Sequence, residues 1–245
     1  MTDAATARLL CSIARAHEIL GARWSLLVVR ELLSGGRRFN EIRRAIPRIS
    51  RTMLSERLQE LALAGVIARI EGPHGPEYEL TEAGQELSSL VGVLATWGQR
   101  WLPRRAKDED LDAEPVLVDM QRRVRFEALP QKPFIIRFEI EGGQPRFLLL
   151  SPSEASLCTH NPGFPEPLLV KTPLAALVAW WRGDVKFLEA QRMGLTLSGT
   201  RRLRRDFPEW FGRYLFATID SARDEGHRST RRLANAETHS GRAQP

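Results

Sequence analysis

Apolar residues recur at helical spacing near the start of the chain and predict two helices there. The first helix is expected over residues 4–20 and the second over residues 24–33, where Ser34, Gly35 and Gly36 end it. The apolar sides would carry Leu9, Leu10, Ile13, His17 and Leu20 in the first helix and Trp24, Leu27, Val28 and Leu32 in the second. Each helix therefore has one side suited to burial.

Two further helices are predicted on either side of a short turn. The first has its apolar positions at Phe39, Ile42 and Ile46, and Pro47 interrupts it. Ser50 is a favourable N-cap for the second helix, and Gly65 would end it. The buried side of this second helix would carry Leu54, Leu58 and Leu61. The pair is predicted to pack through these apolar positions.

The second helix of this pair presents polar side chains opposite its apolar side. They are Arg51, Thr52, Ser55 and Gln59. A helix, a short turn and a polar-faced helix predict a helix-turn-helix, whose second helix enters the major groove with its N-terminal residues nearest the bases. Residues 66–70 and 77–80 would follow as the two strands of a wing. Residues 37–57 hold seven arginines and two glutamates, and phosphate backbones attract such a surface.

This arrangement predicts a set of DNA contacts. Arg51, Thr52 and Ser55 would reach base edges, because they lie at the exposed start of the second helix. The predicted DNA-binding residues together are Arg37, Arg38, Arg48, Ser50, Arg51, Thr52, Ser55, Arg57, Arg69 and His74. Contacts to phosphates or the minor groove would be made by Arg37, Arg38, Arg48, Arg69 and His74. For Arg57 an ion pair with Glu60 or Glu56 is the alternative.

A long helix is predicted after the wing, beginning behind the N-cap Thr81. Its apolar positions are Leu87, Leu90, Val91, Leu94, Trp97 and Trp101. A small domain cannot cover so long an apolar stripe, so we interpret part of it as a dimer interface shared with the first helix. Packing of the stripe on a C-terminal domain is the alternative.

A change of composition divides the chain after this helix. Residues 1–103 form the first domain, residues 104–115 a charged linker, residues 116–220 an α+β domain, and residues 221–245 a polar tail that we expect to be disordered. Strands are expected at 134–140, 147–150, 156–159, 168–171 and 195–198. Helices are expected from the N-cap Thr172, from Asp184 and over residues 208–220, whereas Val116 to Met120 and Phe126 fit either a strand or a helix.

Composition narrows the classes of protein that remain. The chain of 245 residues is 42% hydrophobic and 27% charged, which is typical of a globular protein. Its formal net charge of +6 favours an acidic partner, although so modest an excess is also common on proteins that bind none. Cys11, Cys158 and the five histidines lack the spacing of a disulfide framework or metal site. No apolar run approaches the roughly 18 residues of a membrane span, and no signal peptide is recognisable. We therefore expect a cytoplasmic protein without cofactor, metal or membrane partner.

The motifs of residues 8–102 resemble HxlR-type winged helix-turn-helix regulators. The resemblance is carried by Cys11, Gly21-Ala22-Arg23-Trp24, the LLVVREL run, Arg38-Phe39-Asn40-Glu41-Ile42, MLSERLQELALAG and Leu80-Thr81-Glu82-Ala83-Gly84. It implies a dimeric DNA-binding regulator, and Cys11 matches a position that some members use as a redox sensor. Arg8 and Arg15 favour a reactive thiolate there, whereas Leu9, Leu10 and Ile13 favour the buried structural thiol that we expect. The chain departs from the family pattern at Ser12 and Arg51-Thr52, where proline is usual after the cysteine and at the start of the second helix.

Residues 116–218 are similar to sterol-carrier-protein-like domains, in the run KTPLAALVAWWRGDVKFLEAQRMGLTLSGTRRLRRDFPEWF. This resemblance implies an apolar cavity between sheet and helices. The candidate ligand-binding residues are Phe134, Ile136, Phe138, Trp180 and Trp181. The alternative is that these side chains fill an ordinary core. The arginines at 201, 202, 204 and 205 are typical of a solvated helix face, with DNA phosphates or an anionic ligand headgroup as alternatives.

Taken together, the sequence predicts a mixed fold, a mainly α winged helix-turn-helix domain followed by an α+β domain. The predicted function is a transcriptional repressor that binds double-stranded DNA as a homodimer on a near-palindromic operator. A hydrophobic small molecule in the C-terminal domain would modulate it. A lipid or sterol carrier with an accessory winged helix domain is the alternative. An enzyme is not expected, because no convergent set of ionisable residues is recognisable.

Overall fold

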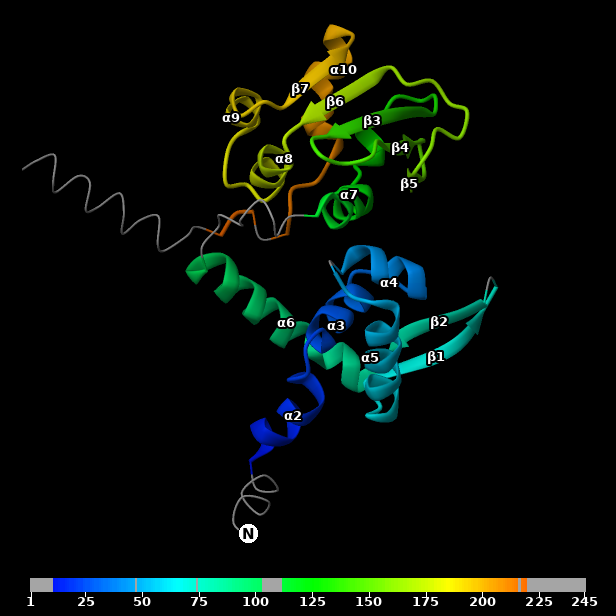
Figure 1. Cartoon of the computed structure of the whole chain (residues 1–245), viewed down its shortest axis with the longest axis vertical. Helices are drawn as coiled ribbons and strands as arrows, with labels where there is room; N and C mark the ends of the chain where they lie inside the picture. Colours follow the sequence, from blue (N-terminus) through cyan, green and yellow to red (C-terminus); the bar gives the residue numbers. More distant parts are fainter. Residues whose placement is uncertain (1–10, 47, 74, 103–111, 216, 220–245) are drawn as a thin grey trace, which may run out of the picture. The chain divides into compact units, whose positions relative to one another are not determined.

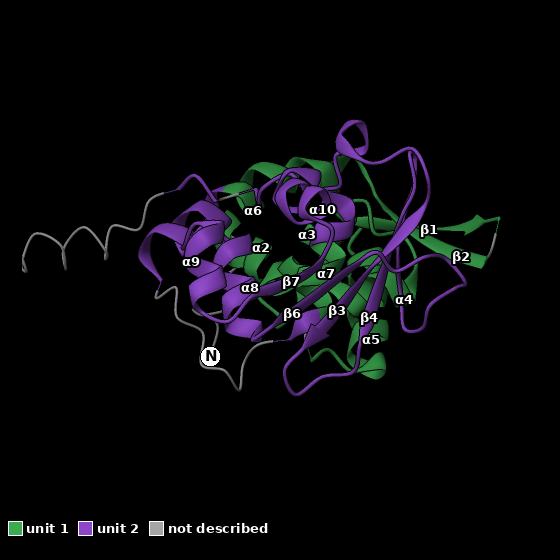
Figure 2. Cartoon of the chain, turned by 90° about the horizontal axis from the view of Figure 1, so that it is seen from above, with its two compact units in different colours: residues 1–92, 114–119 green, residues 93–113, 120–245 purple. Residues whose placement is uncertain are grey.

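The computed structural model describes residues 11–46, 48–73, 75–102, 112–215 and 217–219. The chain forms two compact units (Figure 2). The first comprises residues 1–92 and 114–119, and the second comprises residues 93–113 and 120–245. Within the described ranges, no helix is long and apolar enough to span a bilayer.

The N-terminal elements follow the predicted order (Figure 1). They are the helices α2 (Ser12–Leu20), α3 (Ser25–Leu33), α4 (Phe39–Ala45) and α5 (Arg51–Leu63), the strands β1 (Ile67–Gly72) and β2 (Gly75–Leu80), and the helix α6 (Glu82–Trp101). The hairpin β1–β2 is longer than predicted and extends away from α3, α4 and α5 (Figure 1). The start of the predicted first helix, residues 4–10, lies outside the described residues.

The core of the first unit contains apolar positions that the helical spacing indicated, together with Val29, Ile49 and the wing residues Val66 and Ile67. Its buried residues are Val28, Val29, Leu32, Ile42, Ile46, Ile49, Leu54, Leu58, Leu61, Val66 and Ile67. Burial of each such side chain contributes about 1.5–3 kcal/mol. The prediction for Leu27 was wrong, because that side chain is exposed. Helix α3 instead buries Val28, Val29 and Leu32, which places Leu27 at the edge of its buried side.

Side-chain caps and one glycine set the limits of the helices around the candidate site. The Ser50 hydroxyl accepts a hydrogen bond from the Met53 amide at 3.1 Å, which satisfies a free donor of the first turn of α5. Gly65, with a φ of +70°, ends α5 in the left-handed conformation that other residues adopt only at a cost. Thr81 caps α6 by accepting from the Gly84 amide at 3.2 Å. All three caps agree with the sequence.

Helix α7 (Ala113–Arg122) contributes residues to both units. Its start corrects the predicted linker, because residues 113–115 are helical. It also decides the open choice at residues 116–120 in favour of a helix, and Phe126 lies in the short helix η2 (Phe126–Ala128).

The second unit is organised around a five-stranded sheet in the order β5-β4-β3-β6-β7 (Figure 1). Its strands are β3 (Phe134–Ile140), β4 (Arg146–Leu150), β5 (Ala155–Cys158), β6 (Leu168–Thr172) and β7 (Thr196–Gly199). Strand β3 pairs parallel with β6, and the other pairs are antiparallel. The helices are α8 (Leu174–Trp181), α9 (Phe187–Arg192), α10 (Arg201–Asp206) and η3 (Phe207–Trp210). The mixed fold class is therefore as predicted.

Three helix predictions in the second unit are corrected. The helix expected from Asp184 begins at Phe187, with Lys186 as its N-cap. Thr172 belongs to β6 and Pro173 is the N-cap of α8, so the predicted cap was one residue early. The helix expected over residues 208–220 is not present in the described part of that range beyond Trp210. Phe211 instead forms a β-bridge with Val124, and the Gly212 amide donates to the Arg123 carbonyl at 2.6 Å. This strand-like pairing satisfies backbone groups that a helix would have paired internally.

Candidate nucleic-acid interface

The first two turns of α5 form the exposed polar surface of the helix-turn-helix. Arg51, Thr52 and Ser55 are exposed, whereas Leu54 and Leu58 on the opposite side are buried. The buried side fixes the helix on the core, so the rotation of the polar side is determined by packing. The Ser50 hydroxyl is engaged as the N-cap. Arg51, Thr52 and Ser55 are thus brought together on one surface, and Ser50 has a structural role beside them.

The turn before α5 contains a strained arginine. Arg48 is exposed and has a φ of +63°, in the left-handed region that non-glycine residues rarely adopt. Such a conformation costs about 1–2 kcal/mol for a residue with a Cβ. Strain of this kind is often found at functional sites. The sequence indicated an arginine in the turn, but its backbone conformation was not predicted.

The arginines at the start of α4 contact the wing. Arg37 Nη1 lies 3.2 Å from Glu79 Oε2, and Arg38 Nε lies 3.2 Å from Glu77 Oε1. The Tyr78 amide also donates to the Arg37 carbonyl at 2.8 Å. These contacts tie strand β2 to α4 and offset part of the positive charge counted over residues 37–57. The Arg37 side chain remains 55% exposed, so a phosphate could still reach it.

The glutamates of the wing were missed as part of this surface. Glu77 and Glu79 alternate along β2 and therefore lie on one side of the hairpin. That period of two was visible in the sequence. The arginines that pair with these glutamates, Arg37 and Arg38, lie about forty residues earlier in the chain, and the pairing could not be read from the sequence.

Arg57 lies in an ion pair within α5. Its Nη2 atom donates to Glu60 Oε1 at 2.8 Å, and the side chain is only 14% exposed. Of the two interpretations that the sequence left open, this geometry favours the structural one. Arg69 is exposed on β1 opposite Tyr78. His74 lies outside the described residues.

The candidate ligand-binding side chains of the second unit belong to an aromatic cluster. Phe134 contacts Trp210 with ring centroids 5.2 Å apart, and Trp180 contacts Phe207 at 5.5 Å. Phe138 also packs on Phe207, at 6.4 Å. Phe134, Ile136, Phe138 and Trp181 are buried and Trp180 is half-buried. These contacts are those of a packed core, the alternative raised for these residues. Binding of a ligand there stays a prediction.

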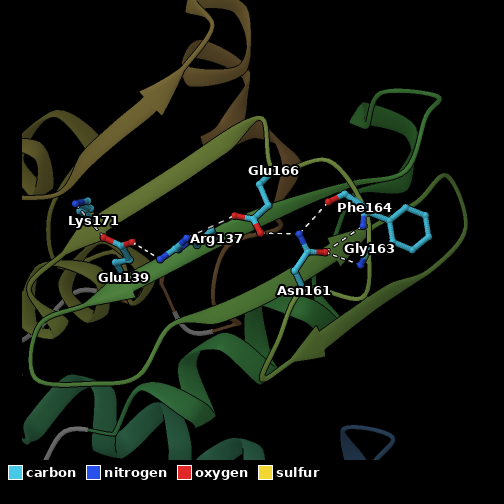
Figure 3. Close-up of polar contacts among 7 residues, drawn as sticks. All are labelled: Arg137, Glu139, Asn161, Gly163, Phe164, Glu166 and Lys171. Atoms are coloured by element: carbon cyan, nitrogen blue, oxygen red, sulfur yellow. Dashed lines mark hydrogen bonds and ion pairs between the residues drawn. The ribbon is translucent and has the colours of Figure 1, made fainter.

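A chain of polar contacts holds the loop before β6 against the sheet (Figure 3). Glu139 lies 3.0 Å from Lys171 Nζ and 2.8 Å from Arg137 Nη2, and Glu166 lies 3.9 Å from Arg137. Asn161 donates to Glu166 at 2.6 Å and accepts from the amides of the loop residues Gly163 and Phe164. The hydrogen bond from Lys171 lowers the pKa of Glu139. The network orders the loop.

The two cysteines have different surroundings. Cys11 is exposed in this chain, contrary to the buried thiol that we expected, and it precedes α2 without a side-chain cap. Cys158 is half-buried on β5. In the described part of the chain, no three His, Cys, Asp or Glu side chains come together as a metal site. A redox role for Cys11 stays a prediction.

Comparison with known proteins adds the following. Residues 19–106 match the model of the HxlR-like helix-turn-helix family. The chain is 43% identical over 91 residues to the uncharacterised HTH-type transcriptional regulator YvaP of Bacillus subtilis, which corresponds to 36% of this chain and 84% of that protein. It is also 43% identical over 96 residues to the regulator Rv3095 of Mycobacterium tuberculosis, and it spans 60% of that protein's length.

Among solved structures, the reduced form of the transcriptional regulator YodB from B. subtilis is similar. It is 35% identical, with 37% of this chain and 92% of that chain covered and a TM-score of 0.33. The two relatives named above are described as HTH-type transcriptional regulators. They lend no support to the alternative of a lipid or sterol carrier. The resemblance of the C-terminal domain to sterol carrier proteins stays a prediction.

Proposed function

Because the chain belongs to the HxlR-like helix-turn-helix family of DNA-binding transcriptional regulators, we propose that it is a repressor that binds a near-palindromic operator as a dimer. One observation carries the proposal for the DNA surface. The start of α5 presents Arg51, Thr52 and Ser55 to solvent, while the other side of the helix is locked into the core. A helix held in this way can enter the major groove without reordering.

The side chains of this surface would have different tasks. Arg51 has the fork of donors that matches the O6 and N7 acceptors of guanine, and Thr52 and Ser55 can donate or accept at base edges. Arg37, Arg48 and Arg69 are exposed around the helix and would hold phosphates, which position the protein without reading sequence. Arg57 would stabilise α5 through Glu60 rather than touch DNA.

Exposed apolar side chains on α2 and α6 support the dimer. Val93 is 68% exposed, Trp97 54% and Ile13 81%. Such side chains along two helices are unfavourable in water, and a second copy of the chain would remove them from it. A two-fold dimer would present two recognition helices to two half-sites about one helical turn apart. Bound over a promoter, it would exclude polymerase by occupancy alone.

A small apolar molecule is the proposed effector. It would bind among the aromatic side chains of the second unit and would change DNA affinity only if it bound the two states of the protein unequally. The support is the apolar character of Phe138, Trp180 and Trp181, of which Trp180 is half-buried. These side chains contact neighbouring rings, so binding would require them to repack.

The test is a selection of binding sites from randomised duplex DNA with the full-length protein. We expect a near-palindromic consensus, and we expect Arg51→Ala to lose preference at one position in each half-site at a cost of about 1–3 kcal/mol. Arg69→Ala is the control, which should weaken all sequences alike. If the wild-type protein selects no consensus, the proposed function is overturned. If Arg51→Ala selects the same consensus as wild type, the placement of α5 in the major groove is overturned.

The selected operator also tests the two remaining parts of the proposal. Transcription in a purified system from a promoter that carries the operator should fall when the protein is added, and a rise would exclude a repressor. Fatty acids and sterols added to the binding assay should shift operator affinity. Equal affinities throughout would remove the effector from the proposal.

A further inference from the structure

Helix α10 carries a dense cluster of exposed positive charge in the second unit. Its exposed arginines are Arg201, Arg202, Arg204 and Arg205. Residues 113–219 hold 15 basic and 11 acidic side chains, so these four arginines in five positions account for most of the local excess. Asp206 is the one acidic residue of the helix. A surface of this kind suits a polyanion.

The four arginines differ in their partners. Arg205 Nε lies 2.8 Å from Asp206 Oδ1 and Arg202 Nε lies 3.6 Å from Asp206 Oδ2. The hydrogen bond from Arg205 lowers the pKa of Asp206, so the carboxylate is ionised at neutral pH and is shared by these two guanidinium groups. Among the residues that the structure describes, no acidic side chain forms an ion pair with Arg201 or Arg204.

Arg201 and Arg204 also share one side of the helix. Residues three apart on a helix are neighbours, so the Arg201 and Arg204 side chains leave the helix from adjacent positions. Guanidinium groups are planar, always charged and matched to phosphate oxygens. Leu203, the apolar residue between them in the chain, is half-buried. The helix therefore offers two adjacent guanidinium groups that can donate hydrogen bonds to phosphate oxygens on its exposed side.

The helix is held in place from both ends. The Thr200 hydroxyl accepts from the Leu203 amide at 3.4 Å as an N-cap. At the other end, Phe207 and Trp210 of η3 are buried in the aromatic cluster, with their rings 6.2 Å apart. The arginines thus project from a fixed backbone, and binding an anion would order only their side chains.

We propose that Arg201 and Arg204 contact DNA phosphates while the N-terminal unit occupies its operator, so that the second unit extends the DNA interface. This inference rests on the proposed function, because the operator complex supplies the polyanion. The contacts are independent of sequence, since phosphates position a protein without specifying bases. They contribute to affinity and to its salt dependence and leave the consensus unchanged.

The experiment measures operator affinity against salt concentration for the full-length protein. Each phosphate neutralised contributes about 0.9 to the slope of log affinity against log salt. The double variant Arg201→Gln, Arg204→Gln is expected to lower the slope by about 3.6, because a dimer carries two copies of each arginine, and to weaken operator and random duplex by the same factor. An unchanged slope overturns the proposal.

Two further variants distinguish direct phosphate contacts of Arg201 and Arg204 from a general effect of net positive charge on DNA affinity. Arg202→Gln with Arg205→Gln removes the same number of charges, but from groups that share Asp206, and is expected to change the slope less. Equal effects of the two double variants overturn the assignment to Arg201 and Arg204. Asp206→Asn releases Arg202 and Arg205 and is expected to raise DNA affinity. A damaged fold would not produce such a gain, and an affinity below that of wild type in a variant with the wild-type unfolding midpoint overturns the proposal.

Two further comparisons distinguish DNA phosphates from lipid phosphates, and distinguish failure of this inference from failure of the proposed function. The Arg201→Gln, Arg204→Gln variant is also compared with wild type for binding to vesicles that contain phosphatidylglycerol. If the variant binds these vesicles more weakly than wild type but binds duplex DNA equally well, the surface binds lipid and the proposal is overturned. If wild type selects an operator and this variant binds it with the wild-type slope, the inference fails and the proposed function stands. If wild type selects no operator, the proposed function itself fails.

Discussion

At the scale of single residues, two non-glycine positions have a strained backbone. Arg48 in the turn before α5 has a φ of +63°, and Trp24 before α3 has a φ of +82°. The Arg23 guanidinium lies over the Trp24 ring, 4.6 Å from its centroid, which helps to hold that residue. Arg48 is exposed on the proposed DNA surface, and strained residues of this kind are often found at functional sites.

Arg48→Gly is predicted to weaken DNA binding while relieving the backbone strain of the turn. Glycine adopts a positive φ freely and relieves about 1–2 kcal/mol of strain, while its greater freedom in the unfolded chain costs about 0.5–1 kcal/mol. Urea unfolding measures the net change in stability, which also includes the loss of the interactions that the Arg48 side chain makes. Operator affinity should fall because the phosphate contact is lost. The control, Arg48→Lys, keeps the charge, and full affinity in Arg48→Gly would exclude the contact.

At the scale of elements, the chain of polar contacts on the sheet of the second unit gives stability a dependence on pH. Glu139 has a pKa lowered from its ordinary value of 4.5, first by the hydrogen bond from Lys171 and further by Arg137. A carboxylate with a lowered pKa in the folded state stabilises the fold above the unfolded pKa. That contribution is lost as the pH falls through the folded value.

Glu139→Gln is therefore predicted to lower stability at neutral pH and to match wild type in strong acid. The difference in urea midpoint between variant and wild type should shrink as the pH falls from 4.5 through the lowered pKa. Glu141→Gln is the matched control, because Glu141 lies just beyond β3 and is exposed. A Glu139→Gln difference that stays constant with pH would show that the network does not stabilise the fold through its charge.

At the scale of the whole molecule, assembly depends on the exposed apolar side chains of α2 and α6. Val93 and Trp97 are exposed in this chain, so polar substitutions there cost a monomer little. In a dimer that buries them, the same substitutions place charges in an apolar interface.

Val93→Glu with Trp97→Glu is predicted to produce a folded monomer with much weaker operator binding. Sedimentation equilibrium measures the mass of each protein in solution, and its urea unfolding transition shows whether it is folded. Leu188→Glu is the control, since Leu188 is 60% exposed on α9, outside the proposed interface. A double variant that stays dimeric would place the interface elsewhere.

Much of the fold was determined by local sequence. The helices α3, α4 and α5, the hairpin β1–β2 and the strands β3 to β6 lie where periodicity and turn residues indicated them. Ser50, Gly65 and Thr81 end or begin helices as predicted, because a cap needs only backbone groups three or four residues away. The polar side of α5 follows from the same spacing, once Leu54, Leu58 and Leu61 are recognised as buried.

The tertiary structure decided what depends on distant partners. Arg37 and Glu79 are 42 residues apart in the chain, and only the docking of the wing on α4 brings them together. Residues 208–220 have helical spacing of apolar side chains, yet pairing of Phe211 with Val124 replaced the helix. The strain at Arg48 follows from the packing of two helices rather than from the residue itself. Local pattern encodes which side of an element is apolar, but which distant group covers it, and which charge offsets another, depends on the folded chain.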